Sequence, residues 1–562
     1  MNARVQRALS SRRWVLALVA LALGLSAPSI ASGFATEDWL FRFSATRPFE
    51  LGNLNLYDAR DLALGVDAAR RFGSLPWITP DDFHISFWRP LASLGYHLDY
   101  RVWGHSPALA HLHSVLVYLG LVAAAAALFR KLLRPAWVAG LAALLFTVDD
   151  AHAHAVGWIA NRHVILGALF GCLALFFHHR WRAEGSRAAA ALAPVMLALG
   201  FASSEATVGA FGYFLAYAAF LDDGRRRLLS LAPAFLVTAA WAVGFKLFGH
   251  GAVGSALYID PVRDPFGYLR ELPNRLGALL AGQLGPIRAD RWHELSSGGR
   301  WLLAFGGFAL FFILVGPPRQ QRVARFFAVG LLLSLLPACA TFPSDRSLFL
   351  PGIGAFGLIA LWVERARRER LASKIVAALL LVLHAGAAPA LFPYRSLAMA
   401  RMDAAVRRAS DSAYASVTGL GERLVVVNSP DFYFCKLLED LRWSRGLPAV
   451  PMTCLAGTLG PMTVERIDPN ALSLTVPASF LDRPFDRLYR DRHHPMQVGD
   501  KVFVGTALVE ITQVDERGAP TQAVFRFMWP IGSKVLRFVV FDGGRYVPFT
   551  PPDVGQELTL GG

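Results

Sequence analysis

Long apolar runs recur along the first 395 residues of the chain and are separated by short polar loops. Most runs are bounded by arginines, a pattern typical of helices that each cross roughly 30 Å of hydrocarbon. We therefore predict about eleven membrane-spanning helices, although several runs are shorter than the usual ~20 residues. The expected spans are residues 14–30, 107–129, 135–148, 163–179, 188–203, 206–221, 228–248, 301–317, 326–341, 348–363 and 375–394.

The pattern changes in the C-terminal part of the chain to short runs of strand-forming residues separated by turns. These runs cover residues 424–427, 501–504, 507–514, 523–528 and 535–541. The pattern predicts an all-α polytopic membrane domain over residues 1–395, with a long first outer loop at 33–106. A small mostly-β or α/β domain follows over residues 396–562.

Basic clusters fall in alternate loops, which is the distribution expected of the cytoplasmic side of a membrane protein. Arg12 and Arg13 precede the first span, and Arg365, Arg367 and Arg368 follow the tenth. The alternation predicts a bacterial inner-membrane protein with a cytoplasmic N-terminus. An odd number of spans then places the C-terminal domain in the periplasm.

Composition agrees with a membrane protein, because 54% of the residues are hydrophobic and only 17% are charged. The net charge of +15 lies in loop clusters rather than on one face, so it does not indicate a nucleic-acid partner. Of the four cysteines, Cys435 and Cys454 lie in the C-terminal domain. There they could form a disulfide or remain two thiols.

Ionisable residues gather in the loops predicted to face outward. Adjacent carboxylates at the end of a helix are often simply exposed to water, and other ionisable groups there often serve only to pair with a neighbour. Spacing alone therefore does not decide whether these residues have a functional or a structural role. Such groups at membrane depth are nevertheless costly unless they face partners or an aqueous cavity. The candidates are Glu37 and Asp38, then Asp149, Asp150, His152, His154 and Arg162, then Glu205, and last Asp345 and Arg346.

Four segments, three of which contain these candidates, resemble a known family in the same order along the chain. Arg89-Pro90-Leu91, Leu98-Asp99-Tyr100, Trp103-Gly104 and His111 look like the first-loop signature of the tetratricopeptide-linked transmembrane O-mannosyltransferases and their bacterial relatives. Residues 146–162 resemble the second-loop motif, matching at His152, Val156, Trp158, Ile159 and Arg162 and differing at Asp149, Asp150, His154 and Asn161. Residues 203–205 and 345–352 are similar to two later motifs, with Ser204 in place of a lysine. The repeats themselves are absent.

The resemblance implies a GT-C fold and a polyprenyl-phosphate-sugar donor. It implies that Asp38, or its neighbour Glu37, deprotonates an acceptor hydroxyl. Asp149 and Asp150 would orient the acceptor or, with His152, hold a divalent metal ion. His154, Glu205, Arg89 and Asp345 would line the donor and acceptor sites. Arg162 and Arg346 would balance the departing phosphate.

The sequence therefore predicts a membrane glycosyltransferase that acts on the outer face of the inner membrane. The bilayer and a glycan, lipid or protein acceptor are its expected partners. The substituted motif positions also allow a catalytically inactive GT-C-like scaffold that binds a glycan or a protein. A transporter is disfavoured because no pair of Gly/Pro-broken helices repeats along the chain.

Overall fold

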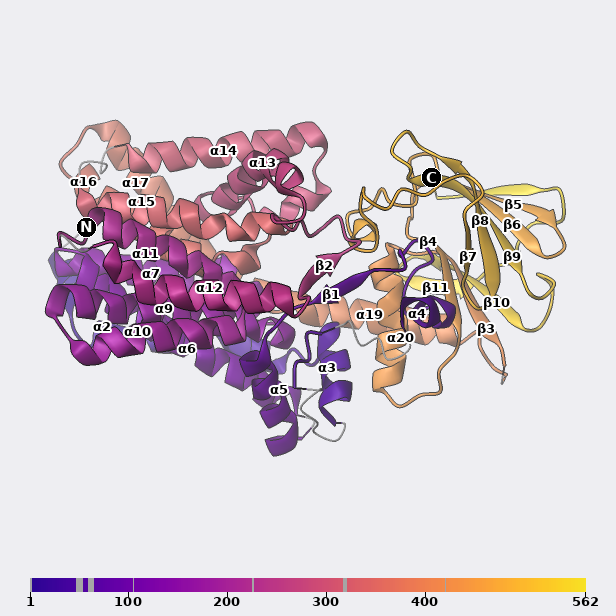
Figure 1. The fold of residues 1–562 in the computed structure, drawn as a ribbon, viewed down its shortest axis with the longest axis horizontal. Coiled ribbons are helices and arrows are strands. Elements are labelled where there is room, and N and C mark those ends of the chain that lie inside the picture. Colours follow the sequence, from indigo (N-terminus) through magenta and orange to yellow (C-terminus); the bar gives the residue numbers. More distant parts are fainter. Residues whose placement is uncertain are drawn as a thin grey trace. The chain divides into compact units, whose positions relative to one another are not determined.

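The computed structural model describes residues 3–46, 54–58, 65–104, 106–224, 227–316, 321–419 and 421–561. The chain divides into two compact units (Figure 1). Unit 1 contains residues 1–57, 87–250 and 260–400, and unit 2 contains residues 58–86, 251–259 and 401–562. Residues 58–86 of the first outer loop, and residues 251–259 of the loop after the seventh expected span, therefore belong to the same unit as the C-terminal residues.

Unit 1 is a helical bundle. Among the described residues of unit 1 and of the helical stretch that continues from it into unit 2, eight helical stretches are long and apolar enough to cross a membrane. This number agrees with a multi-pass membrane protein. These stretches are Trp14–Ala31, Pro107–Leu132, Ile159–Glu184, Leu229–Leu247, Ser297–Val315, Arg322–Ala340, Phe349–Ala366 and Leu371–Tyr414. The three other expected spans coincide with shorter helices, α7 (Ala136–Val148), α10 (Arg187–Ser203) and α11 (Val208–Phe220). Eleven crossings thus remain a prediction.

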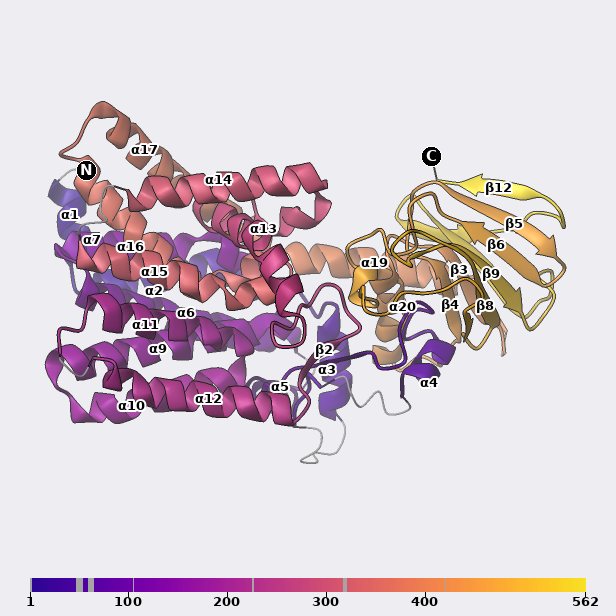
Figure 2. The ribbon, with the colours of Figure 1, turned by 45° about the horizontal axis from the view of Figure 1, so that its top comes forward.

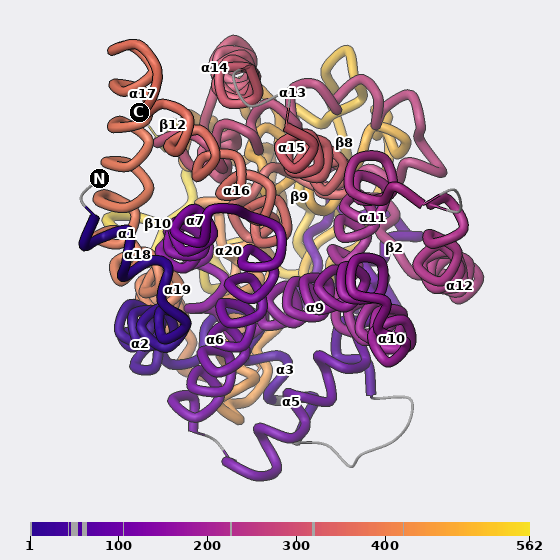
Figure 3. Tube along the Cα trace, turned by 90° about the vertical axis from the view of Figure 1, so that its left-hand side faces the viewer, coloured from indigo at the N-terminus to yellow at the C-terminus, as the bar shows by residue number. Residues whose placement is uncertain are grey.

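The bundle packs around α16 (Phe349–Ala366), as the end-on view in Figure 3 shows. Of the apolar window in this helix, 89% is buried, against 11% in α12 (Ala232–Leu247). Glycines allow α16 to approach α15 (Arg322–Leu335) closely: a Cβ on Gly354 would lie 2.6 Å from the Phe327 carbonyl oxygen. Close packing through small residues is the usual way in which membrane helices associate.

Ion pairs join several arginine-bearing loops at one end of the bundle. Arg182 Nε donates to Asp222 Oδ2 at 2.7 Å, and Arg322 Nη1 donates to Asp223 Oδ2 at 2.8 Å. The side-by-side run of α9 (Arg162–Glu184), α10 and α11 in Figure 2 brings these loops together. The loops that alternate with them, which carry the candidate site residues, meet at the opposite end.

Unit 2 combines two sheets. Strands β11 (Arg545–Pro548), β10 (Leu536–Asp542), β3 (Arg423–Asn428) and β4 (Met452–Ala456) form one sheet, and helix α20 (Phe432–Ser444) connects the parallel strands β3 and β4. The second sheet is antiparallel, in the order β12 (Glu557–Leu560), β5 (Met462–Asp468), β6 (Ala471–Thr475), β9 (Pro520–Phe527), β8 (Ala507–Val514) and β7 (Lys501–Phe503). The expected β-rich C-terminal region is confirmed.

A segment of the first outer loop completes the core of unit 2. It contains α4 (Gly65–Phe72) and β1 (His84–Ser86), and β1 pairs with β2 (Gly251–Val253). Trp77 is 1% exposed, its indole nitrogen donates to the Leu455 carbonyl oxygen at 3.0 Å, and its ring meets Phe480 and Phe525 edge-on. The segment is therefore a buried part of unit 2 rather than a surface loop.

Candidate functional site

The Glu37–Asp38 pair begins α3 (Glu37–Thr46), directly after Thr36, whose φ of 49° is rare for a β-branched residue. Asp38 is 1% exposed. Its carboxylate accepts hydrogen bonds from the Ala160 N–H at 2.7 Å and from the Ala35 N–H at 3.0 Å. The alternative that these carboxylates are merely solvated is therefore wrong for Asp38, whereas Glu37 is half-buried.

Burial raises the pKa of Asp38 well above its ordinary value, while the two backbone hydrogen bonds act in the opposite direction. Because one bond goes to Ala160, Asp38 connects the first outer loop to the second. Asp38 thus holds the backbone in place, and Glu37 is the more accessible carboxylate of the pair.

Arg162 is fully buried, and each end of its guanidinium has a protein partner. Nη1 donates to Asp99 Oδ2 at 2.5 Å, Nε donates to Ser114 Oγ at 2.9 Å, and Nη2 donates to the Ala110 carbonyl oxygen at 2.7 Å. This arrangement holds α5 (Pro90–Val102) and α6 (Pro107–Leu132) against the start of α9. Arg162 is therefore positioned for structure rather than for contact with a departing phosphate.

Arg89 and Glu205 form a two-point ion pair between the first outer loop and the turn after α10. Arg89 Nε donates to Glu205 Oε2 at 2.8 Å, and Nη2 donates to Oε1 at 2.5 Å. Burial acts to raise the pKa of Glu205, but the Arg89 guanidinium outweighs burial and lowers it. Glu205 is therefore ionised at neutral pH. Ser204 stands where the family that the sequence resembles has a lysine. Its Oγ lies 3.0 Å from His163 Nδ1.

The outer loop that contains Asp150 and the one that contains Asp345 meet at Arg395, near the end of α18 (Ala388–Ser396). Arg395 Nη1 donates to Asp150 Oδ2 at 2.5 Å, and Nη2 donates to Asp345. Asp345 also accepts a hydrogen bond from the Ala289 N–H at 2.8 Å, so it fixes the 288–290 turn as well. The sequence reasoning missed Arg395, although a lone arginine at the outer end of the last span was a signal that could have found it.

Asp149 lies beside this cluster, 3% exposed, and accepts a hydrogen bond from Gln283 Nε2 at 3.2 Å. Burial, and secondarily the charge of Asp150, raises the pKa of Asp149 to about 8. Asp149 is therefore mostly protonated at neutral pH, and it can donate as well as accept a hydrogen bond.

The arrangement of Asp149, Asp150 and His152 does not fit a divalent cation. His152 Nε2 is 3.7 Å from Asp149 Oδ2, its ring stacks on Phe349 at 4.3 Å, and Asp150 is engaged by Arg395. Burial also lowers the pKa of His154, to about 4. In the part of the chain that the structure describes, no three His, Cys, Asp or Glu side chains are placed to hold a metal ion.

Arg346 differs from the other arginines of this end. It is half-buried, and its guanidinium lies over the Phe342 ring at 5.1 Å. Among the described residues, it forms neither a hydrogen bond nor an ion pair through its side chain. Its positive charge lowers the pKa of both Glu205 and His154, so it lies within electrostatic range of the two side chains.

No protein-family model and no curated protein matches the chain. Solved structures that resemble it include ArnT from Cupriavidus metallidurans bound to undecaprenyl phosphate, at 14% identity and a TM-score of 0.38 over 79% of this chain and 90% of ArnT. The archaeal oligosaccharyltransferase AglB from Archaeoglobus fulgidus is 12% identical, with a TM-score of 0.45 over 79% of this chain and 65% of AglB. The mycobacterial arabinofuranosyltransferase AftD is 16% identical, with a TM-score of 0.39 over 92% of this chain and 40% of AftD.

Proposed function

We propose that the protein is an inverting glycosyltransferase that moves a sugar from a polyprenyl-phosphate carrier to an acceptor on the outer face of the inner membrane. The observation that carries the proposal is the gathering of ionisable side chains from separate loops at one end of an apolar bundle. Glu205 and Asp150 are partly exposed there, and the Arg346 guanidinium, which lies over the Phe342 ring, forms no ion pair with a described carboxylate. Charges at membrane depth are costly and usually mark a functional site.

Arg346 is the residue we assign to the donor phosphate. Its neighbours Arg89 and Arg395 are held by carboxylates. A guanidinium is suited to bind two oxygens of a phosphate at once, and the interaction strengthens as negative charge develops on the leaving group. Arg346 would therefore stabilise the polyprenyl phosphate as it departs.

Glu37 is the residue we assign as the general base, because Asp38 beside it is buried against backbone N–H groups. Glu37 would take the proton of the acceptor hydroxyl as the hydroxyl oxygen attacks the anomeric carbon from the face opposite the phosphate. The bond between that carbon and the phosphate oxygen then breaks, and its electron pair leaves with the polyprenyl phosphate. Asp149 and Asp150 would orient the acceptor.

The test is transfer of a labelled sugar from a panel of polyprenyl-phosphate donors in membranes that contain the protein. Glu37→Gln should lower kcat by roughly 10²–10⁴-fold. Arg346→Gln should lower kcat/KM, and Arg346→Lys should restore part of it. Arg322→Gln, at the opposite end of the bundle, is the matched control and should transfer normally. Absence of transfer across the whole panel would refute the proposal.

A non-enzymatic scaffold is the second candidate, and a specific observation favours it. Two residues to which the resemblance assigns a catalytic or binding role, Asp38 and Arg162, have their polar atoms occupied by the protein itself. A fold that retains such residues for structure could instead present its outer surface to a glycan or a protein. Cross-linking that recovers a stable partner, with no dependence on donor sugar, would support this candidate.

The proposal also sets the topology. The arginine-bearing end of the bundle should be cytoplasmic, and Glu205 and unit 2 should be periplasmic. A single cysteine placed at position 205 or 516 should react with an impermeant maleimide in spheroplasts, and one placed at position 367 should not. Labelling at position 367 before lysis would overturn this orientation.

A further inference from the structure

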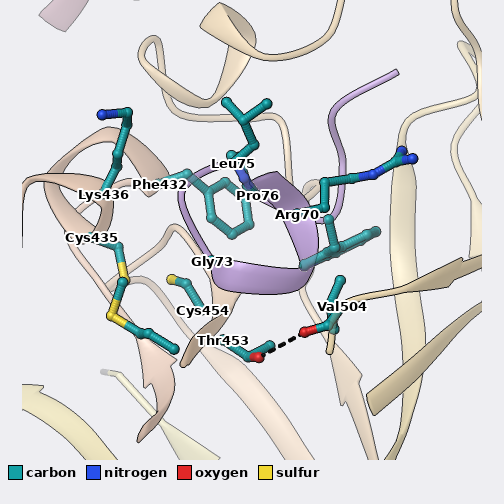
Figure 4. Close-up of a pocket in the computed structure, with 12 residues that line it drawn as sticks. Arg70, Gly73, Leu75, Pro76, Phe432, Cys435, Lys436, Thr453, Cys454 and Val504 are labelled. Atoms are coloured by element: carbon teal, nitrogen blue, oxygen red, sulfur yellow. Dashed lines mark hydrogen bonds between the residues drawn. The ribbon is translucent and has the colours of Figure 1, made fainter. Parts of the chain in front are cut away.

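A small pocket in unit 2 brings two cysteines together. The docked outer-loop segment, residues 70–77, covers the pocket, while α20 and β4 form its other walls (Figure 4). Cys435 comes from the first turns of α20, and Cys454 comes from the middle of β4. In Figure 4 the two sulfur atoms point toward each other across the pocket.

The surroundings of the two sulfurs are apolar and tightly packed. Cys435 is 1% exposed, Cys454 is half-buried, and both pack in one hydrophobic cluster with Val426 and Met452. The Cys454 and Cys435 side chains are close enough to share a hydrogen bond. We propose that Cys435 and Cys454 form an intramolecular disulfide in the mature protein, which cross-links α20 to β4 beneath residues 70–77.

The covering segment sits too close to these walls to be displaced by small movements. A Cβ on Gly73 would lie 2.0 Å from the Met452 carbonyl oxygen, and a Cβ on Gly505 would lie 2.1 Å from that of Arg71. Both glycines have positive φ, of 88° and 74°. Once residues 70–77 have docked, a protein oxidant has no route to Cys435.

An oxidant therefore reaches the pair through Cys454, which is only half-buried. The thiolate of Cys454, the more exposed residue, attacks a sulfur of an oxidised dithiol–disulfide carrier and forms a mixed disulfide with it. Cys435 then attacks the Cys454 sulfur, which forms the intramolecular bond and releases the carrier as a dithiol. Two electrons and two protons pass to the carrier, so the reaction is balanced.

After docking, the pair is chemically protected. Burial and the neighbouring Cys435 raise the pKa of the Cys454 thiol, and Asp486 and Asp431 act in the same direction. A thiol with a raised pKa has little thiolate and reacts slowly, so two reduced thiols here would not make a reactive redox site.

The experiment lyses cells in denaturant that contains one alkylating reagent, then reduces the purified full-length protein and alkylates it with a mass-distinct reagent. Cys435 and Cys454 should carry the second reagent. Cys172 and Cys339, buried in the bundle, should stay reduced until denaturation, so the first reagent is added in denaturant and marks them as internal controls. Detection of the first reagent on Cys435 and Cys454 would overturn the proposal.

A second measurement does not depend on the labelling. A non-reducing digest should contain one peptide pair joined through Cys435 and Cys454, and the intact protein should run as a monomer on a non-reducing gel. In Cys435→Ser, Cys454 should become available to the first reagent. A cross-linked dimer in place of the internal pair would refute the assignment. Neither measurement requires sugar transfer, so its result is separate from the proposed function.

Discussion

Replacement of Arg395 by methionine tests whether the outer-end cluster is held by charge. Arg395 joins Asp150 and Asp345, and its side chain is 7% exposed. Removing one partner of a buried ion pair typically destabilises a protein by about 3–5 kcal/mol, because a carboxylate is left uncompensated. Asp345 is 1% exposed, and among the described residues its remaining ion pair is with Arg288 Nε, at 3.6 Å. We therefore expect Arg395→Met to lower the free energy of unfolding by roughly that amount.

The assay is the apparent melting temperature of the detergent-solubilised protein, followed by size-exclusion chromatography after heating. The matched control is Arg322→Met, which breaks an ion pair whose side chains are 52% and 78% exposed. An exposed pair contributes about 0–1 kcal/mol, so this control should melt nearly like the wild type. The triple variant Arg395→Met, Asp150→Asn and Asp345→Asn should recover part of the loss. If Arg395→Met melts like its control, the ion-pair assignment is wrong.

Three further outcomes are expected from thermal unfolding. The unfolded chain releases the Asp149 proton near the ordinary pKa of about 3.9, whereas the folded protein keeps it up to a pKa of about 8, so stability should fall as the pH rises from about 4 to 8; Asp149→Asn should remove that slope. Trp77→Ala should lower the free energy of unfolding by about 3–5 kcal/mol and expose residues 58–86 to trypsin, whereas Trp443→Ala, at an exposed site, should do neither. Asp38→Asn should lower the free energy of unfolding by about 1–3 kcal/mol and reduce the abundance of the protein, unlike Glu37→Gln. If Asp38→Asn melts at the wild-type temperature, the structural role of Asp38 is refuted.

Local patterns predicted the parts of the fold that depend on nearby residues. Apolar length located the helices, and alternating strand-forming residues located β3, β8, β9 and β10. Strands β5 and β6 were missed because charged and polar side chains interrupt their runs, as in Met462–Asp468. Short helices such as α7 fall below the length at which sequence alone indicates a crossing.

The chemistry of the outer end was predictable only as a set of residue types. The family resemblance placed Asp38 and Arg162 among the reactive groups, but their partners lie 122 and 63 residues away and occupy their polar atoms. Arg395 was overlooked for the same reason, since Asp150 is 245 residues distant. Whether an ionisable group serves structure or chemistry depends on such distant partners, which no local pattern contains.

Unit 2 includes residues of two outer loops as well as the C-terminal part of the chain. Residues 58–86 leave unit 1 after Tyr57 and return to it at Phe87, only two residues before Arg89. Between those points the chain contributes Trp77 to the core of unit 2 and pairs β1 with β2 from a later loop. Removal of the C-terminal residues would leave Trp77 without the core in which it packs. The C-terminal residues therefore cannot be treated as a detachable module.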